Sequence, residues 1–230
     1  ADSGLETVLT QQHVVTVLNP DSGNWLTIEA MQNEWQSQPE TPPIVLAQPN
    51  SFAYMMYTSG STGKPKGTCI THRNIIRTTY RSQYVQPQPD DVFMQIAPVS
   101  FDAATFEIWC PLLNGASLAI LPPQMLTLRD YAREIMDSGA TKIFLTSGLF
   151  HQMVEEELEA LRNVRMLLSG GDVLSVTHVN QVLDHLDCVM VNGYGPTECT
   201  VFTTCHSMSR HTHLNGTVPI GRPISDTTLY

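Results

Sequence analysis

Residues 57–67 read YTSGSTGKPKG, and this stretch places three glycines, four serine or threonine hydroxyls and two lysines in eleven residues. Small residues let backbone N–H groups approach an anion closely, hydroxyls add hydrogen-bond donors, and lysines add positive charge. The stretch therefore predicts a loop that binds a triphosphate. It is not a Walker A loop, because Gly63-Lys64 is followed by Pro65. Composition alone leaves a plain surface linker equally open, since such residues are common in loops.

From residue 51 onward the chain alternates between strand and helix patterns. The expected strands are residues 52–57, 91–97, 117–121, 142–146, 164–168 and 188–191. The expected helices are residues 71–84, 102–113, 128–138, 149–161 and 176–186. Strand–helix–strand units in succession predict an α/β fold with a largely parallel sheet flanked by helices.

The first part of the chain is expected to stand apart as an N-terminal strand and connector segment, residues 1–50, ahead of an α/β core at residues 51–230. A β-branched run at residues 14–18 predicts a strand, and residues 26–35 predict a short helix. Four prolines then predict an extended connector.

Four loops that carry reactive groups follow expected strands of the core. They are the loop after Tyr57, the Phe101-Asp102 turn, residues 169–172 (SGGD) and residues 192–198 (NGYGPTE). Ligands of such sheets bind beyond the carboxyl ends of the strands. The sequence therefore predicts one site at one edge of the sheet.

The loop at residues 192–198 offers the groups that a purine nucleotide with a metal-bound phosphate needs. Asn192 supplies an amide, Tyr194 supplies a flat ring, and two glycines leave room for a ligand to approach. Thr197 and Glu198 place a hydroxyl beside a carboxylate, a suitable oxygen ligand for Mg²⁺. Taken alone, the loop could equally be a tight turn with a solvated surface charge.

Three motifs in order resemble the adenylation domains of nonribosomal peptide synthetases, a branch of the adenylate-forming enzymes. They are residues 52–67, residues 100–104 (SFDAA) and residues 192–198. The resemblance runs from about Tyr54 to the last residue, and implies part of the large N-terminal subdomain of such an enzyme.

The resemblance implies which residues bind ATP and Mg²⁺. Tyr194 would stack on adenine, Asn192 would bind its amino group, and Glu198 would ligate Mg²⁺. Lys66, Thr197 and Glu198 are the expected catalytic residues. The expected ATP-binding residues are Thr58, Ser59, Gly60, Ser61, Thr62, Gly63, Gly170, Gly171, Asp172, Asn192, Gly193, Tyr194, Gly195 and Thr197.

The resemblance also implies an amino-acid substrate, whose α-amino group Asp102 would hold. The alternative for Asp102 is a helix N-cap. The expected substrate-binding residues are Asp102, Ala103, Phe106, Leu145, Leu168, Gly170, Gly193, Val201 and Phe202. Apart from Asp102 they are apolar or glycine, so the pocket favours an aliphatic amino acid such as valine. An acyl-CoA or aryl-acid ligase of the same superfamily is the alternative for acids without an amino group.

Several parts of an adenylation domain are expected to lie outside this chain: the ribose-binding aspartate, the hinge and the C-terminal subdomain with its catalytic lysine. The expected activity of the parent is antibiotic biosynthesis by amino-acid activation, with the product handed to a phosphopantetheine carrier. Carrier-protein and condensation domains are the expected partners. The chain alone is expected to be inactive, and a non-catalytic binding or scaffold fragment is the alternative.

Composition limits the other functions that the chain could have. The net charge of −10 argues against a nucleic-acid partner, which usually meets a basic face. The sequence has no apolar run long enough for a membrane span and no signal-peptide pattern, so we expect a cytoplasmic protein without a membrane partner. Five cysteines without a Cys-x-x-Cys pair suggest free thiols.

Overall fold

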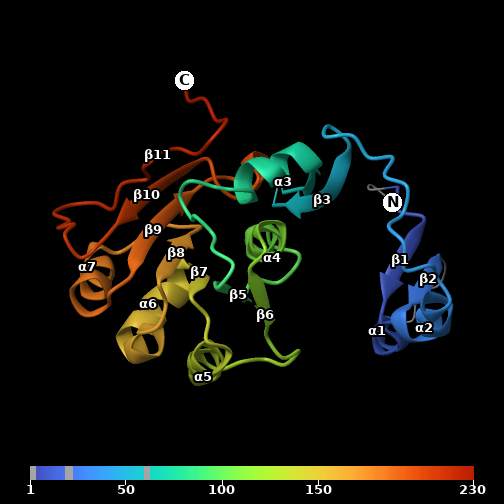
Figure 1. Cartoon of the computed structure of the whole chain (residues 1–230), viewed down its shortest axis with the longest axis horizontal. Helices are drawn as coiled ribbons and strands as arrows, with labels where there is room; N and C mark the ends of the chain where they lie inside the picture. Colours follow the sequence, from blue (N-terminus) through green and yellow to red (C-terminus); the bar gives the residue numbers. More distant parts are fainter. Residues whose placement is uncertain (1–3, 19–22, 60–62) are drawn as a thin grey trace. The chain divides into compact units, whose positions relative to one another are not determined.

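The computed structural model describes residues 4–18, 23–59 and 63–230. The chain divides into two compact units, residues 1–47 and residues 48–230 (Figure 1).

The first unit is a small strand–helix–strand–helix arrangement. β1 (Thr7–Thr10) and β2 (Asn24–Thr27) pair in parallel, with α1 (Gln12–Leu18) between them and α2 (Ile28–Gln36) after them. The predicted strand at residues 14–18 is wrong, because two parallel strands need a crossover connection and this segment supplies its helix. The predicted helix near residues 26–35 is confirmed as α2.

The second unit contains a sheet of seven strands in the order β11-β10-β9-β8-β7-β5-β6. The strands are β5 (Val92–Gln95), β6 (Ser117–Ile120), β7 (Lys142–Thr146), β8 (Met166–Gly170), β9 (Val189–Tyr194), β10 (Thr204–Met208) and β11 (Arg222–Pro223). The neighbours from β6 to β9 are parallel, which confirms the largely parallel sheet. The last two strands are antiparallel and were not predicted.

The helices of this unit begin close to where their capping residues predict. They are α3 (His72–Thr79), α4 (Ala103–Asn114), α5 (Leu128–Ser138), α6 (Ser147–Glu156) and α7 (Val176–His185). Thr71 and Thr127 each form a capping box with the third residue of the following helix. Gly139, with φ of 64°, ends α5 in the left-handed conformation.

The sheet is buried on both faces. Helices α5, α6 and α7 pack on one face, and α4 packs on the other. Successive strand residues alternate between the two cores, so Leu145 joins the first core while Phe144 joins the second, beside Phe106. The two-sided burial explains why these strands read as continuous apolar runs.

Among the strands that the structure describes, β3 (Phe52–Thr58) pairs with β4 (Lys66–Thr71) alone, in an antiparallel pair separate from the seven-stranded sheet. The predicted strand is confirmed, but its expected place in the parallel sheet is wrong. The physical reason is that residues 66–71 form a strand of their own, which takes up the pairing of β3.

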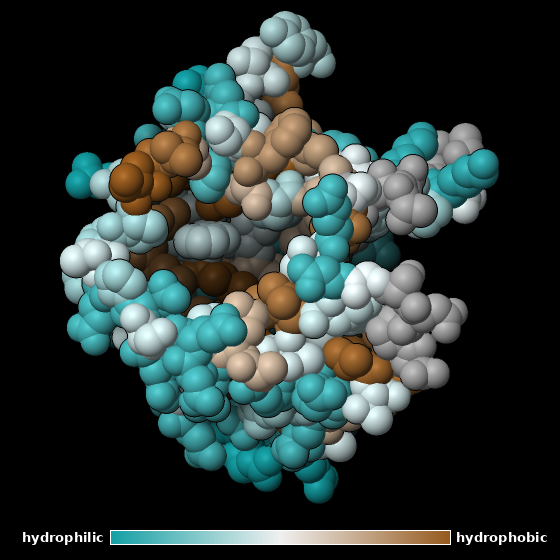
Figure 2. All heavy atoms as spheres, turned by 90° about the vertical axis from the view of Figure 1, so that its right-hand side faces the viewer, coloured by the Kyte–Doolittle hydropathy of each residue, from teal (hydrophilic) through white to brown (hydrophobic). Residues whose placement is uncertain are grey.

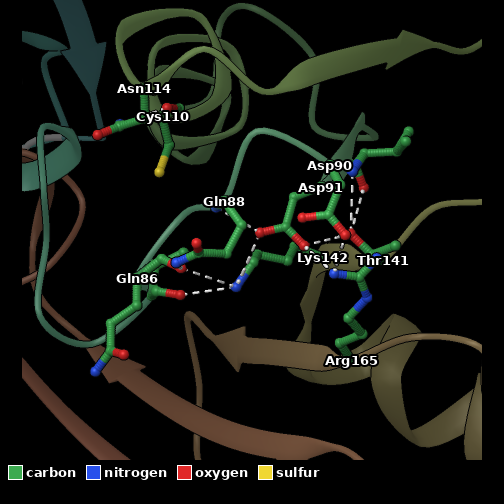
Figure 3. Close-up of polar contacts among 11 residues, drawn as sticks. Gln86, Gln88, Asp90, Asp91, Cys110, Asn114, Thr141, Lys142 and Arg165 are labelled. Atoms are coloured by element: carbon green, nitrogen blue, oxygen red, sulfur yellow. Dashed lines mark hydrogen bonds and ion pairs between the residues drawn. The ribbon is translucent and has the colours of Figure 1, made fainter.

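The amino ends of the parallel strands carry a buried charge network, drawn in Figure 3. Asp91 precedes β5, Lys142 begins β7 and Arg165 precedes β8. The Lys142 ammonium lies 3.3 Å from Asp91 Oδ2 and donates to the Val85 carbonyl at 2.8 Å. Thr141 Oγ1 donates to Asp91 Oδ1 at 2.8 Å, and Arg165 Nη1 lies 3.4 Å from the same oxygen. The Asp91 carboxylate is thus fully satisfied inside the protein.

All five cysteines are free thiols, as their spacing predicts. Among the described residues, no helix combines the length and apolar character needed to cross a membrane.

Candidate active site

Two of the predicted loops meet through a direct hydrogen bond. Thr197 Oγ1 donates to Asp102 Oδ2 at 2.7 Å. Asp102 is 8% exposed and makes no side-chain capping bond to α4, although it stands at the N-cap position. The capping interpretation of Asp102 is therefore not what the structure shows. Its carboxylate is directed instead to the loop that carries Thr197, at the carboxyl edge of the sheet.

A pocket of about 420 Å³ lies between the loops that follow β8 and β9. Its lining residues are Gly171, Asp172, Val173, Leu174, Asn192, Gly193, Tyr194, Gly195, Pro196, Val218 and Ile220. Asn192 Nδ2 donates to the Pro219 carbonyl at 2.9 Å, which leaves the amide oxygen as the acceptor for a ligand. The Tyr194 ring is half exposed. Pocket size and lining suit a heterocycle that stacks on Tyr194 and donates to Asn192.

Ser147 fixes the backbone of the loop after β8. Ser147 Oγ is 3.1 Å from the Gly170 carbonyl and 2.8 Å from the Asp172 carbonyl. Gly170 pairs with Gly193 across β8 and β9. The structure therefore brings the predicted residues of these two loops together.

Gly193 in β9 and Gly195 just after it lie against another part of this chain. A Cβ atom on Gly193 would lie 2.4 Å from the Phe202 ring, and one on Gly195 would lie 2.6 Å from the Val201 carbonyl oxygen. We expected these glycines to leave room for a ligand. The structure assigns that room to the segment at residues 201–203, which folds back against them.

The described residues of the predicted phosphate loop lie at the end of β3 and the start of β4. Gly60, Ser61 and Thr62 lie outside the described residues. Ser59, Gly63 and Lys66 are exposed, and Thr58 is partly buried, with Oγ1 3.5 Å from the Lys66 carbonyl oxygen. β4 contacts the short 3₁₀ helix η2 (Thr197–Cys199), so the hairpin lies beside the turn that carries Glu198.

Glu198 fits the requirements of a magnesium ligand. Its carboxylate is exposed, and it makes no ion pair or side-chain hydrogen bond with any residue that the structure describes. The described residues contain no group of three His, Cys, Asp or Glu side chains that could hold a metal ion. Mg²⁺ typically takes one or two carboxylates together with substrate phosphates and water, so a single carboxylate beside a phosphate loop suits it.

Most residues of the predicted side-chain pocket form one cluster. Ala103, Phe106, Leu168, Val201 and Phe202 belong to the same core, and the Phe106 and Phe202 ring centroids are 5.5 Å apart. Each of these side chains is at most 5% exposed, so they are packed against one another. A substrate side chain can enter only where one of them turns aside.

Among the apolar side chains of this predicted set, Leu145 alone lies outside the cluster. It lies in the core on the other face of the sheet. Its neighbour Phe144 lies in the cluster instead, with its ring centroid 6.0 Å from that of Phe202. Sequence reasoning missed Phe144, because both residues are apolar and only the direction of each side chain separates them.

An apolar groove of about 390 Å³, which the sequence did not predict, runs between β3, α3 and α4. Its walls include Tyr54, Ile75 and Trp109, and Thr105 Oγ1 donates to the Tyr54 hydroxyl at 2.8 Å. Figure 2 shows exposed hydrophobic residues, in brown, among hydrophilic ones on one face of the molecule. The groove lies on the opposite side of α4 from the sheet core.

Comparison with known proteins shows the family of the chain. Residues 2–230 match the sequence profile of the family described as AMP-binding enzyme. The chain belongs to the AMP-binding enzyme family. Among family members, it is 43% identical over 230 residues to a linear gramicidin synthase protein of Brevibacillus parabrevis, covering all of this chain and 3% of that protein. A second linear gramicidin synthase protein of the same organism is 45% identical over 232 residues. This match covers all of this chain and 4% of that protein.

Solved structures of other proteins share the fold. The N-terminal subdomain of NpsA from Klebsiella oxytoca, in complex with 3-hydroxybenzoyl-AMSN, superposes with a TM-score of 0.85 at 28% identity, over 96% of this chain and 56% of that one. PA1221, an NRPS protein containing adenylation and PCP domains, superposes with a TM-score of 0.74 at 29% identity. The match covers 95% of this chain and 53% of PA1221. The chain therefore spans about half of these structures, and the resemblance to NRPS adenylation domains is confirmed.

Proposed function

We propose that this chain is the nucleotide- and amino-acid-binding part of an adenylation domain. In the proposed reaction an oxygen of the amino-acid carboxylate attacks the α-phosphorus of ATP. The bond from that phosphorus to the bridging oxygen breaks, which yields an aminoacyl adenylate and pyrophosphate. The observation that carries the proposal is the buried Asp102 carboxylate, joined to Thr197 at 2.7 Å where two motif loops meet.

Each charged group has a separate task in this proposal. Asp102 binds the substrate ammonium, because a carboxylate with little exposure needs a partner of opposite charge. Lys66 binds the phosphates that leave as pyrophosphate, where it stabilises negative charge that grows during the reaction. Glu198 holds Mg²⁺, which would neutralise phosphate charge. Asn192 and Tyr194 hold the adenine.

The substrate side chain would lie among the aromatic and aliphatic residues of the second core. We propose Phe144 in place of Leu145 at the base of this pocket, because Phe144 is the one that contacts the Phe202 ring. The side chains of this cluster are apolar, so an aliphatic side chain is favoured, with valine first. One methylene changes binding by about 1–3 kcal/mol in such pockets, so isoleucine and leucine are close competitors.

An aryl acid is the second candidate substrate. The NpsA neighbours are bound to 3-hydroxybenzoyl-AMSN and anthranilyl-AMSN, which are aryl compounds. Asp102 separates the two candidates, because an aryl acid without an amino group gives this carboxylate no partner. A non-catalytic scaffold is the third possibility and predicts no activity in any context.

The partners are proposed from the relatives. PA1221 contains adenylation and PCP domains, and an artificial NpsA–ThdA fusion is an adenylation–PCP di-domain. We propose that a carrier-protein thiol receives the aminoacyl group, that condensation domains act next, and that the free cysteines suit a reducing cytoplasm.

The experiment is a segment exchange. The chain replaces the segment that it matches in the linear gramicidin synthase protein of 45% identity, so that the host supplies the remaining parts of the adenylation domain. ATP–pyrophosphate exchange is then measured with valine, isoleucine, leucine, aspartate, glutamine and 3-hydroxybenzoate, for the chimera and for the 230-residue chain alone.

We expect exchange with valine by the chimera, abolished by Asp102→Ala, and none by the chain alone. Exchange that favours 3-hydroxybenzoate and survives Asp102→Ala would select the aryl-acid candidate. A preference for aspartate or glutamine would contradict the aliphatic pocket. A folded chimera that is inactive with every acid would favour the scaffold.

A further inference from the structure

The segment after η2 holds its backbone in a rare conformation. Thr200 and Val201 have φ of 57° and 69°, in the left-handed region that β-branched residues seldom adopt. The Thr200 hydroxyl is buried and has no hydrogen-bond partner among the residues that the structure describes. Such conformations persist only where surrounding groups hold them. Neighbouring parts of the chain must therefore fix this segment.

Arg77 on α3 makes most of the hydrogen bonds that fix this segment. Its Nη2 donates to the Cys199 carbonyl at 2.5 Å and to the Phe202 carbonyl at 3.1 Å. Its Nη1 donates to Thr227 Oγ1 at 2.5 Å. The guanidinium thus joins both ends of the strained segment to a third part of the chain, and Figure 1 shows α3 beside this region.

The next residue of α3 adds one further bond to the same segment. Thr78 is fully buried, and its Oγ1 donates to the Thr200 carbonyl at 3.0 Å. Arg77 and Thr78 together therefore bind three of the four carbonyls of residues 199–202. The planar guanidinium of arginine can donate to two carbonyls at once. A lysine ammonium does so less well.

The held segment carries groups of the proposed site. Glu198 comes directly before it, and Val201 and Phe202 are part of the side-chain cluster. Phe202 also lies against Gly193, whose Cβ position it nearly fills. The backbone conformation at residues 199–202 therefore decides where the magnesium ligand and one wall of the substrate pocket stand.

We propose that Arg77 is a positioning residue, whose guanidinium holds residues 199–202 so that Glu198 and Phe202 face the ligands of the site. It acts through the backbone carbonyls and touches no ligand. The roles of Glu198 and Phe202 toward the ligands rest on the proposed function. The hydrogen bonds from Arg77 to the backbone of residues 199–202 are a property of this chain alone. The two can therefore be tested separately.

The first test needs no ligand and uses the chain's own cysteines. The labelling rate of each thiol by iodoacetamide is followed by peptide mass spectrometry in the wild type, Arg77→Met, Arg77→Lys and Arg73→Met. Cys199 lies in the segment, Cys69 is exposed, and Cys110 and Cys188 are buried. Arg73 is the matched control, an exposed arginine one turn earlier on the same helix.

We expect Arg77→Met to speed the labelling of Cys199 about tenfold relative to Cys69, because local opening exposes the segment. Arg77→Lys should give a smaller increase, and Arg73→Met should leave the rate unchanged. Cys110 and Cys188 should stay protected. A wild-type rate at Cys199 in Arg77→Met would overturn the inference. An equal rise at Cys110 and Cys188 in both Arg77 variants would assign Arg77 to global stability and overturn it as well.

The second test measures kinetics in the chimera. Arg77→Met should raise KM for valine and weaken the preference for valine over leucine about tenfold, the scale of one methylene. A merely destabilised protein would lose active fraction and keep its KM and preference, which would overturn the positioning role. If the wild-type chimera shows no exchange with any acid, the proposed function fails, and the labelling rates alone decide the case of Arg77.

Discussion

Charged side chains are buried and paired at the amino ends of the parallel strands, and exposed and unpaired among the described residues near the carboxyl ends. At the amino ends, Asp91 and Lys142 are buried and satisfied by each other and by neighbouring groups (Figure 3). Beyond the carboxyl ends, Glu198 on η2 and Lys66 on the neighbouring hairpin strand β4 are exposed and have no charged partner among the described residues. One end uses charge to fix the structure, and the other leaves charge available for a ligand.

Asp102 lies between these two cases and shows why the difference matters. It is 8% exposed, yet its carboxylate accepts a hydrogen bond from the Thr197 hydroxyl and pairs with no cation among the described residues. A carboxylate with so little exposure is stable only with further partners. The carboxyl edge therefore depends on its ligand in a way that the amino edge does not, and the following changes test this difference.

The largest expected effect is at the amino end. Lys142→Met leaves Asp91 buried without its ammonium partner, and breaking a buried pair in this way typically costs about 3–5 kcal/mol. Urea unfolding of the chain should report this loss. Arg165→Met, which removes a half-exposed arginine from the same carboxylate, should cost no more than about 1 kcal/mol. Equal losses for both variants would contradict the structural role of the Asp91–Lys142 pair.

Glu107 on α4 is a buried acid near the carboxyl end, and it should make stability depend on pH. Its Oε2 accepts from the Ile96 and Ala97 N–H groups, and burial raises the pKa of Glu107 to about 8. The folded state therefore binds the proton more tightly than the unfolded state. Its contribution is complete below the unfolded pKa of 4.5 and falls as pH rises to about 8.

Glu107→Gln cannot lose a proton, so it should remove this trend. The difference in unfolding free energy between wild type and variant should change by on the order of 3 kcal/mol between pH 5 and about 8. Urea unfolding across this range measures it. Parallel pH profiles for the two proteins would mean that Glu107 titrates normally.

Thr197→Val should have a smaller effect. It removes the hydroxyl that donates to Asp102 and leaves that carboxylate without its bond, which typically costs about 1–3 kcal/mol. A saturating substrate amine should restore part of the loss, because it provides the missing partner. Thermal unfolding of the chimera with and without valine reports both quantities, and no recovery with valine would count against the role of Asp102.

Glu198→Gln should have the smallest effect on folding. Surface substitutions of this kind change stability by about 0.5 kcal/mol or less. The same variant should lose most of the Mg²⁺ dependence of ATP–pyrophosphate exchange in the chimera. A large loss of stability, or an unchanged Mg²⁺ dependence, would contradict the assignment of Glu198 to the ligand side of the comparison.

The sequence predicted the strand at residues 142–146 and the helix at residues 128–138 to the residue, because capping residues and buried apolar runs bound them. It missed β4 and β10, whose short polar sequences lack a regular apolar alternation. It also misread residues 14–18, where local β-propensity gave way to the need for a crossover helix.

The candidate site was predicted in part. The loops, Asp102 and Glu198 carry recognisable chemistry, so the sequence could point to them. The choice between Phe144 and Leu145 could not be made, because a strand buried on both faces is apolar at every position. The sequence did not indicate Arg77, since its partners, the Cys199 and Phe202 carbonyls and the Thr227 hydroxyl, lie more than a hundred residues away.

The most direct measurement is isothermal titration of a non-hydrolysable valyl adenylate analogue into the purified chain and its Asp102→Ala variant. We predict saturable binding of one analogue per chain, weakened about tenfold or more in the variant, since truncating one partner of a buried charge pair typically costs about 2 kcal/mol or more. Absence of saturable binding, or equal affinity in the two proteins, would contradict a nucleotide and amino-acid site at the carboxyl edge of this sheet.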